Sequence, residues 1–323
     1  MNQEDRPQKV SRARKAIPAV AILLVLLAAI GLIICWGPLT LRRTPFSAPE
    51  ASHHTWDEIL SHPKPITIRT YSTGMVQTEL SGIMNLEHEL AQGIEDEVVE
   101  LPVIVGLVQH QEFGSHLIDA GLDASYVHNP YGNMRGIMVK SKSGVFSQEP
   151  NTHIAAILSR ENVEIQSVFL THLHPDHAAG ILDLPKDIPY ITGKGELYVN
   201  FTFFMAGNHL AGIDEVLDFD FATGVDLPPL GRSIDVFGDG SLWAISSSGH
   251  SKGHVLYLIN GTEEQALVTG DACNTQYQFE TEVGPGSFSS DLEQAQVGLD
   301  RIIAFKQRYP EVKLVYGHDW PEL

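Results

Sequence analysis

The distribution of apolar residues divides the chain into a short apolar run near its start and a long region of mixed pattern. The run AIPAVAILLVLLAAIGLIICW, residues 16–36, carries no charge and is long enough to cross a bilayer, which takes about 20 residues. Lys and Arg are denser before the run than after it, which favours a cytoplasmic N-terminus. We therefore predict a basic cytoplasmic segment at 1–15 and a single-pass transmembrane anchor at 16–38, with the rest of the chain on the extracytoplasmic side. A cleaved signal peptide is the alternative, although no A-x-A pattern follows the run.

The region after the anchor has the short apolar runs of a folded domain. Residues 39–65 predict a linker with one helical turn. From there, β-branched and apolar runs of strand length recur between turns. Two longer patterns predict helices, one at 151–163 with Asn151 as its N-cap and one at 290–309. The alternation of strands and helices favours an α/β or α+β fold in layers, built as one domain over 66–323.

Two segments have less regular patterns. Residues 126–150 contain several Gly and Asn residues and predict a long loop. Residues 200–212 are strongly apolar and irregular, which favours a place in the core, with a lid over a binding site as the alternative.

Charge is distributed unevenly between the N-terminal region and the predicted domain. The chain has 21 Lys and Arg against 40 Asp and Glu, but residues 1–43 hold 7 of the basic and 2 of the acidic residues. The remaining 14 basic and 38 acidic residues give a formal charge of −24. Because binding to a phosphate backbone requires a basic surface, nucleic acid is excluded as a partner.

The stretch THLHPDH, residues 171–177, crowds four potential metal ligands into the end of a predicted strand and the start of a helix. In an extended segment residues i and i+2 point the same way, so His172 and His174 can chelate one ion. Pro175 ends the extended stretch, and Asp176 and His177 on the next turn can face a second ion. One tetrahedral ion cannot comfortably use all four ligands from so tight a segment, so the spacing favours two ions over a solvated polar turn.

Three further strand ends each supply one more ligand type. His250 follows a strand and a tight Gly turn in SSGHSKGH, Asp271 follows an apolar strand in VTGDA, and His318 follows the last strand in VYGHD. This recurrence at strand ends strengthens the prediction of a metal centre.

Taken in order, LIDAG, THLHPDH, SSGHSKGH, TGDA and VYGHD resemble the motifs of metallo-β-lactamase-fold hydrolases, and they span residues 117–318. The resemblance implies a four-layer αβ/βα sandwich, in which two sheets lie between helical layers and the metals sit at one edge. Asp119 in LIDAG is similar to a supporting aspartate of this family, and His254 to a histidine near the site. A buried structural role fits each of these two residues equally. The resemblance implies that His172, His174 and His250 hold a first metal, that Asp176, His177 and His318 hold a second, and that Asp271 bridges them.

Such a centre implies hydrolysis of a small-molecule carbonyl compound. Two divalent cations, zinc for a His-rich site with Mn, Fe or Co as alternatives, lower the pKa of a bridging water. The hydroxide attacks a lactone, ester or thioester carbonyl. Asp271 holds both ions, and Asp176 can shuttle a proton.

The branch of the family is narrowed by what the chain contains. The bridging Asp271 disfavours a β-lactamase, since those of this fold generally lack it, and the charge of −24 disfavours a nuclease. The last helix and the GHD motif resemble N-acyl homoserine lactonases. Those enzymes place a substrate-contacting tyrosine three residues after the bridging aspartate, where this chain has Asn274. Asn274 can still donate a hydrogen bond to substrate, and Tyr277 lies nearby in the sequence.

A mononuclear iron enzyme that oxidises persulfides is the second function class for this fold. Such enzymes usually lose the second metal site, whereas Asp176, His177 and His318 are present here, which favours two metals and hydrolysis. β-Lactamase activity stays a further alternative.

Overall fold

The computed structural model describes residues 21–31, 41–197, 200–201, 205–207 and 209–320. Residues 21–31, part of the predicted anchor, are helical. The remainder of the anchor and the predicted segment 1–15 lie outside the described residues. Across the described part of the chain, no helix has both the length and the apolar character needed to span a membrane.

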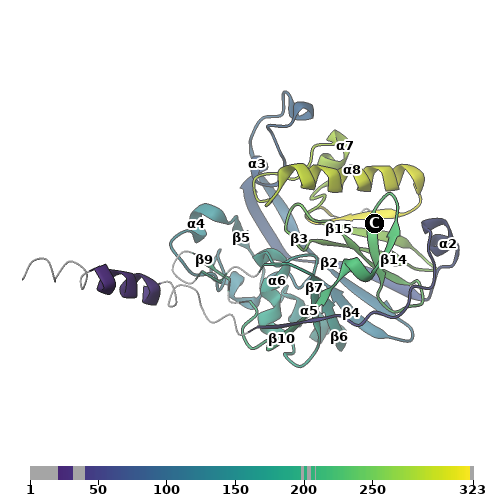
Figure 1. Cartoon of the computed structure of the whole chain (residues 1–323), viewed down its shortest axis with the longest axis horizontal. Helices are drawn as coiled ribbons and strands as arrows, with labels where there is room; N and C mark the ends of the chain where they lie inside the picture. The colour runs from purple at the N-terminus through teal and green to yellow at the C-terminus, as the bar shows by residue number, and fades with distance from the viewer. Residues whose placement is uncertain (1–20, 32–40, 198–199, 202–204, 208, 321–323) are drawn as a thin grey trace, which may run out of the picture.

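Two β-sheets form the centre of the fold (Figure 1). A small two-stranded sheet is formed by β8 (Asn200–Phe201) and β9 (Met205–Ala206). The larger sheet has the strand order β1 (Arg42–Pro45), β10 (Glu215–Phe219), β7 (Tyr190–Gly193), β6 (Ile165–Phe169), β4 (Gly114–Ile118), β3 (Val98–His110), β2 (Ile66–Glu79) and β5 (Val145–Ser147). The second central sheet, called the smaller sheet below, has the order β11 (Val225–Leu227), β12 (Gly231–Asp235), β13 (Leu242–Ser246), β14 (Val255–Asn260), β15 (Gln265–Gly270) and β16 (Lys313–Tyr316).

Strand β14 shows how the sequence builds the layers. Successive side chains of a strand point to opposite faces of the sheet. Val255, Tyr257 and Ile259 pack in the core between the two sheets, which also contains Phe169 of the larger sheet. Leu256 and Leu258 pack in a separate core with the helices on the outer face. Because both faces of β14 are covered, its six residues are all buried, which explains its continuous apolar pattern.

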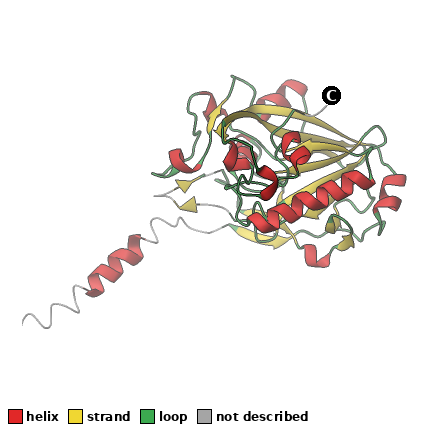
Figure 2. Ribbon diagram, turned by 90° about the horizontal axis from the view of Figure 1, so that it is seen from above, coloured by secondary structure: helices red, strands yellow, loops and turns green. Residues whose placement is uncertain are grey.

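Helices cover both outer faces of the paired sheets (Figure 2). The smaller sheet packs against α2 (Trp56–Ser61) and α8 (Leu292–Arg308), and the larger against α5 (Ile154–Glu161) and η3 (Ala179–Asp183). The predicted arrangement of two sheets between helical layers is therefore confirmed. The remaining helical turns are α3 (Leu80–Ile83), η1 (Glu89–Ala91), η2 (Ala124–Val127), α4 (Val139–Lys142), α6 (Pro175–Ala178), η4 (Phe221–Thr223) and α7 (Gln276–Thr281).

The two longer predicted helices form, with one correction. In α8 the Asp291 side chain accepts a hydrogen bond from the Gln294 N–H, and buried Ala295, Leu299 and Ile302 follow at helical spacing. The predicted N-cap of α5 is wrong. Asn151 adopts a left-handed backbone (φ 64°) in the preceding turn, and the cap position belongs to a residue two positions later, His153.

The predicted linker at 39–65 is corrected over its described part. Strand β1 pairs in parallel with β10 and thereby belongs to the larger sheet. In α2, Trp56 and Ile59 are fully buried in the core beneath α8. Burial of a side chain such as Ile59 contributes about 1.5–3 kcal/mol. The predicted helical turn is present as α2, but the pattern missed β1 and the burial of α2, because both depend on residues more than 150 positions away.

The predicted loop at 126–150 is also more ordered than expected. It contains α4 and β5, and β5 adds to the outer edge of β2. Of residues 200–212, the structure describes 200–201, 205–207 and 209–212. Leu210 lies in the core under the larger sheet, as predicted, whereas Gly207 and His209 line a pocket.

Candidate metal centre

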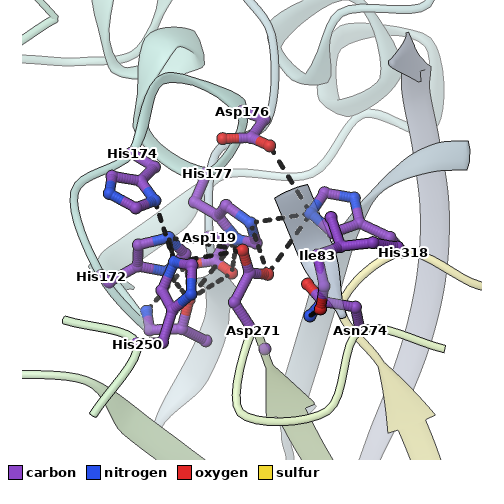
Figure 3. A network of polar contacts seen from close by, with 12 residues as sticks. Ile83, Asp119, His172, His174, Asp176, His177, His250, Asp271, Asn274 and His318 are labelled. Carbon is purple, nitrogen blue, oxygen red and sulfur yellow. Dashed lines mark hydrogen bonds and ion pairs between the residues drawn. The ribbon is translucent and has the colours of Figure 1, made fainter. Parts of the chain in front are cut away.

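The ends of several strands deliver the predicted ligands to one edge of the sandwich. Strands β13, β15 and β16 run in the same direction, because β13 and β15 are each antiparallel to β14 and β16 is parallel to β15. Their carboxyl ends precede His250, Asp271 and His318. The carboxyl end of β6 in the facing sheet precedes the stretch 171–177. Figure 3 shows all seven predicted ligand side chains converging at this edge.

The stretch 171–177 folds as its sequence predicts. His174 is extended (φ −68°, ψ 155°) and forms the N-cap of α6, with Pro175 at the first helical position. His172 and His174 therefore leave an extended backbone, while Asp176 and His177 leave the first turn of the helix. Because the backbone changes from extended to helical at Pro175, the first pair belongs to one group of ligands and the second pair to another.

A first ligand group consists of His172, His174, His250 and Asp271. His250 Nε2 lies 2.9 Å from His174 Nδ1 and 3.2 Å from His172 Nε2. Asp271 Oδ2 lies 3.3 Å from His250 Nε2. Nitrogen ligands about 2 Å from a tetrahedral zinc ion lie roughly 3.3 Å from one another, so these spacings fit a shared ion.

A second ligand group consists of Asp176, His177 and His318. His318 Nε2 lies 3.5 Å from Asp176 Oδ2 and 3.4 Å from His177 Nε2. Asp271 also faces this group, because its Oδ1 lies 3.1 Å from His177 Nε2 and 3.3 Å from His318 Nε2. The Asp271 carboxylate thus presents one oxygen to each group.

The polar atoms of this cluster fit cations better than they fit one another. Three ring nitrogens of the first group converge, and hydrogen bonds among them cannot use all of their lone pairs. Asp271 Oδ1 is buried and accepts no hydrogen bond from the described residues. Buried polar atoms are normally paired, so a donor set of this kind suits a bound metal.

Partners outside the cluster fix the orientation of several imidazoles. His177 Nδ1 lies 2.8 Å from Asp119 Oδ2, and His318 Nδ1 lies 3.0 Å from the Pro102 carbonyl oxygen. His250 Nδ1 lies 3.2 Å from Ser289 Oγ. With the far nitrogen engaged, each ring turns Nε2 towards the cluster, as histidine ligands of metals commonly do.

Asp119 also supports the loop that carries four ligands. Its carboxylate accepts hydrogen bonds from the Thr171 N–H at 2.7 Å and from the Thr171 hydroxyl. Its backbone is left-handed (φ 62°), a conformation in which Asp is enriched among non-glycine residues. His254 lies behind the cluster, and its Nε2 accepts a hydrogen bond from the Asp271 N–H at 3.1 Å. Both residues therefore contact ligands without joining either group.

Close backbone approaches hold the ligand loops together. A Cβ at Gly249 would lie 2.4 Å from the Ala295 backbone nitrogen, so only glycine lets the turn before His250 lie against α8. Ser290 N–H donates to the His250 carbonyl oxygen at 2.8 Å and secures the other side of the same turn.

Burial and charge divide the imidazoles into two kinds. Burial holds the pKa of His172 and of His250 well below the usual value. Burial also disfavours protonated His177 and His318, but Asp271 and neighbouring carboxylates outweigh it and raise the pKa of both. Burial alone would keep Asp271 neutral, but the imidazoles of His177, His318 and His250 hold its pKa well below the usual range.

A pocket of about 290 Å³ lies against the cluster. His174, Asp176, Asp271 and His318 form its polar end. The other walls are mainly apolar, from Val76, Ile83, Phe146, Leu173 and Phe288, with Lys142 at the rim. A larger cavity of about 710 Å³ lies between β2 and β16 and contacts none of the ligands.

The two predicted substrate-contacting residues are placed differently from the ligands. Asn274 is buried, and its Nδ2 donates to the Ile83 carbonyl oxygen at 3.1 Å and to Gln278 Oε1 at 3.2 Å. Tyr277, in α7, is 47% exposed. Neither residue lines the 290 Å³ pocket, so their contact with substrate stays a prediction. Ser289 and Glu196 also contact the ligand loops, but they belong to no recognised motif and no sequence pattern marks them.

Comparisons with known proteins agree with this geometry. The family model of the metallo-β-lactamase superfamily matches residues 99–318. An N-acyl homoserine lactonase, AttM of Rhizobium johnstonii, is 27% identical over 231 residues, which cover 68% of this chain and 82% of the relative. AttM of Agrobacterium fabrum is 25% identical over 225 residues, with the same coverage of both chains.

Solved structures show the same fold at lower identity. A quorum-quenching N-acyl homoserine lactone hydrolase superposes with a TM-score of 0.60 at 20% identity and covers 80% of this chain and 94% of its own. AidC, described as a dizinc quorum-quenching lactonase, superposes with a TM-score of 0.51 at 15% identity, covering 80% of this chain and 90% of its own. The family match covers about two thirds of the chain and includes all seven predicted ligands. The chain therefore belongs to the metallo-β-lactamase superfamily, as a metal-dependent hydrolase with lactonase-like sequence.

Proposed function

We propose that this chain is a dinuclear metal-dependent hydrolase that cleaves the ring ester of a lactone carrying an apolar acyl group. The observation that carries the proposal is the placement of Asp271, whose two carboxylate oxygens face separate ligand groups. Such a carboxylate suits a bridging ligand. The similarity to lactonases supports the choice of a lactone, and esters and thioesters share the same carbonyl chemistry.

The residues around the cluster have separable roles in this reaction. When bound, a pair of divalent cations lowers the pKa of water and polarises a carbonyl group. Asp176 lines the pocket, and its Oδ2 lies 3.5 Å from His318 Nε2. The other oxygen can hold the proton that leaves the attacking water and deliver it to the ring oxygen of the opening lactone. The apolar walls, Phe146 and Phe288 among them, exclude water from the acyl chain.

The test is proton release at neutral pH by the full chain loaded with zinc or manganese. The panel contains acyl homoserine lactones, simple lactones, esters, thioesters and a cephalosporin. We expect turnover of lactones that is lost in His172→Ala, with Glu215→Gln, which pairs with Arg42 at the start of β10, as a control. Turnover only of the cephalosporin, or lactone turnover that persists in His172→Ala, would contradict the proposal.

We also propose that residues 16–38 anchor the enzyme in a membrane with the catalytic domain on the extracytoplasmic face. The uncharged apolar run and the basic residues before it support this placement. A reporter fused after Leu323 tests it. Reporter activity confined to the cytoplasm, or release of the chain from membranes by alkaline carbonate, would refute it.

A further inference from the structure

We propose that Glu196 is a positioning residue that sets the geometry of the first ligand group by joining its two loops. Glu196 follows β7 and is only 4% exposed. Its Oε1 accepts a hydrogen bond from the Leu173 N–H at 3.1 Å. Its Oε2 accepts from the Ser251 hydroxyl at 2.6 Å and from the Gly253 N–H at 2.9 Å. This inference rests on the metal-binding role proposed above.

The donors come from the residues next to the ligands. Leu173 stands between His172 and His174, and Ser251 follows His250 directly. One carboxylate therefore connects the backbone that carries the first two imidazoles with the turn that carries the third. The second group has different support, since Asp119 contacts His177 and the Pro102 carbonyl contacts His318.

The turn after β7, which carries Glu196, packs directly against the turn after His250. A Cβ at Gly193 would lie 2.0 Å from the Gly253 carbonyl oxygen, and a Cβ at Gly253 would lie 2.5 Å from the Glu196 backbone nitrogen. The turn after β7 and the turn after His250 thus touch backbone to backbone. Arg43 of β1 donates to the Glu196 carbonyl oxygen at 3.1 Å and pairs with Asp218, which fixes the turn to the edge of the larger sheet.

The arrangement requires a side chain that only accepts hydrogen bonds. A carboxylate accepts on both oxygens, whereas the Gln amide must direct an NH2 group at one of its two sets of donors. Glu196→Gln therefore frees either Leu173 or the Ser251 turn, with almost no change in volume. Glu196→Asp keeps the charge but is one methylene too short to reach both loops.

The experiment measures zinc affinity by chelator competition in two backgrounds. His318→Ala retains the first group, and His174→Ala retains the second. We expect Glu196→Gln to weaken zinc binding roughly 10- to 100-fold in the His318→Ala background, as loss of such partners typically does, and to leave it unchanged in the His174→Ala background. The visible spectrum of cobalt bound to the first group should also change, which a general loss of stability would not produce.

The controls separate the possible failures. Glu215→Gln, at the far end of β10, should change neither affinity, and Glu196→Asp gives the same selective loss if the Gln variant does not fold. Equal weakening in both backgrounds, or no weakening in either, would overturn the role of Glu196. Absence of zinc binding in the unsubstituted chain would contradict the proposed function instead.

Discussion

The two ligand groups lie side by side and both face Asp271, yet they differ in the pKa values of their imidazoles and in the residues that support them. In the first, His172 and His250 have lowered pKa values because they are buried. Glu196 accepts hydrogen bonds from both of their loops, and Ser289 Oγ contacts His250 Nδ1. In the second, nearby carboxylates raise the pKa of His177 and His318. The difference implies that the first group is ready to bind a cation at neutral pH, whereas the second must first lose protons.

The largest expected effect comes from removing Asp271, which faces both ligand groups. Asp271→Ala takes one oxygen from each group, so hydrolysis should fall at least roughly 1,000-fold, which corresponds to about 4 kcal/mol of transition-state stabilisation. Proton release on the best lactone of the panel measures this loss. Near-normal turnover in a folded Asp271→Ala variant would mean that the groups do not act as one centre.

Removing one group at a time should have the next largest effect. His174→Ala and His318→Ala each remove one imidazole from one group, so each variant should retain a single tightly bound zinc ion per chain. Metal analysis after gel filtration counts the ions. Loss of all zinc in both variants would show one mixed site in place of two.

The pH dependence should distinguish the groups in those same variants. Below its pKa an imidazole carries a proton and cannot bind metal. Because the pKa values of His177 and His318 are raised above 6.5, zinc affinity in His174→Ala should rise with pH above 6.5 and fall in acid. The lowered pKa values of His172 and His250 predict a nearly constant affinity around pH 7 in His318→Ala.

Titration calorimetry in two buffers of different ionisation enthalpy measures the protons released. The second group should release about one proton or more per zinc ion at pH 7, and the first close to none. Equal proton release by both variants would show that the two ligand groups do not differ in protonation at neutral pH.

The smallest effects should come from the outer partners. Ser289→Ala removes the contact to His250 Nδ1 and should weaken only the first group, by about 10-fold. Asp119→Asn should weaken the second group more than the first, since Asp119 contacts His177 Nδ1 directly and reaches His172 only through Thr171. Chelator competition in the single-group variants checks both, and a larger loss in the first group for Asp119→Asn would contradict this assignment.

The sequence predicted which seven side chains come together, because each one stands in a local motif at a strand end. The spacing of His172, His174 and His177 around Pro175 depends only on the change from extended backbone to helix. The supporting residues depend on contacts between distant segments. Glu196 meets Ser251 across 55 positions, and β1 pairs with a strand more than 170 positions away, so no local pattern marks either.

Asn274 shows where a motif position is a weaker guide. It stands three residues after Asp271, but its amide donates to Ile83 and Gln278 and its side chain is 1% exposed. Its spacing in the sequence gave no information about which way the chain turns after the ligand. The helical turn predicted within 39–65 is present, but its place in the core was missed for a related reason, since Trp56 packs against Trp243 and Phe305 from distant parts of the chain.

The most direct test of the account is the number of zinc ions bound per chain, measured in parallel for the unsubstituted protein and for Asp271→Ala. We predict two ions in the unsubstituted chain and at most one in the variant, because Asp271 offers one oxygen to each ligand group. A single ion in the unsubstituted chain, or two ions retained in Asp271→Ala, would contradict a centre bridged by this carboxylate.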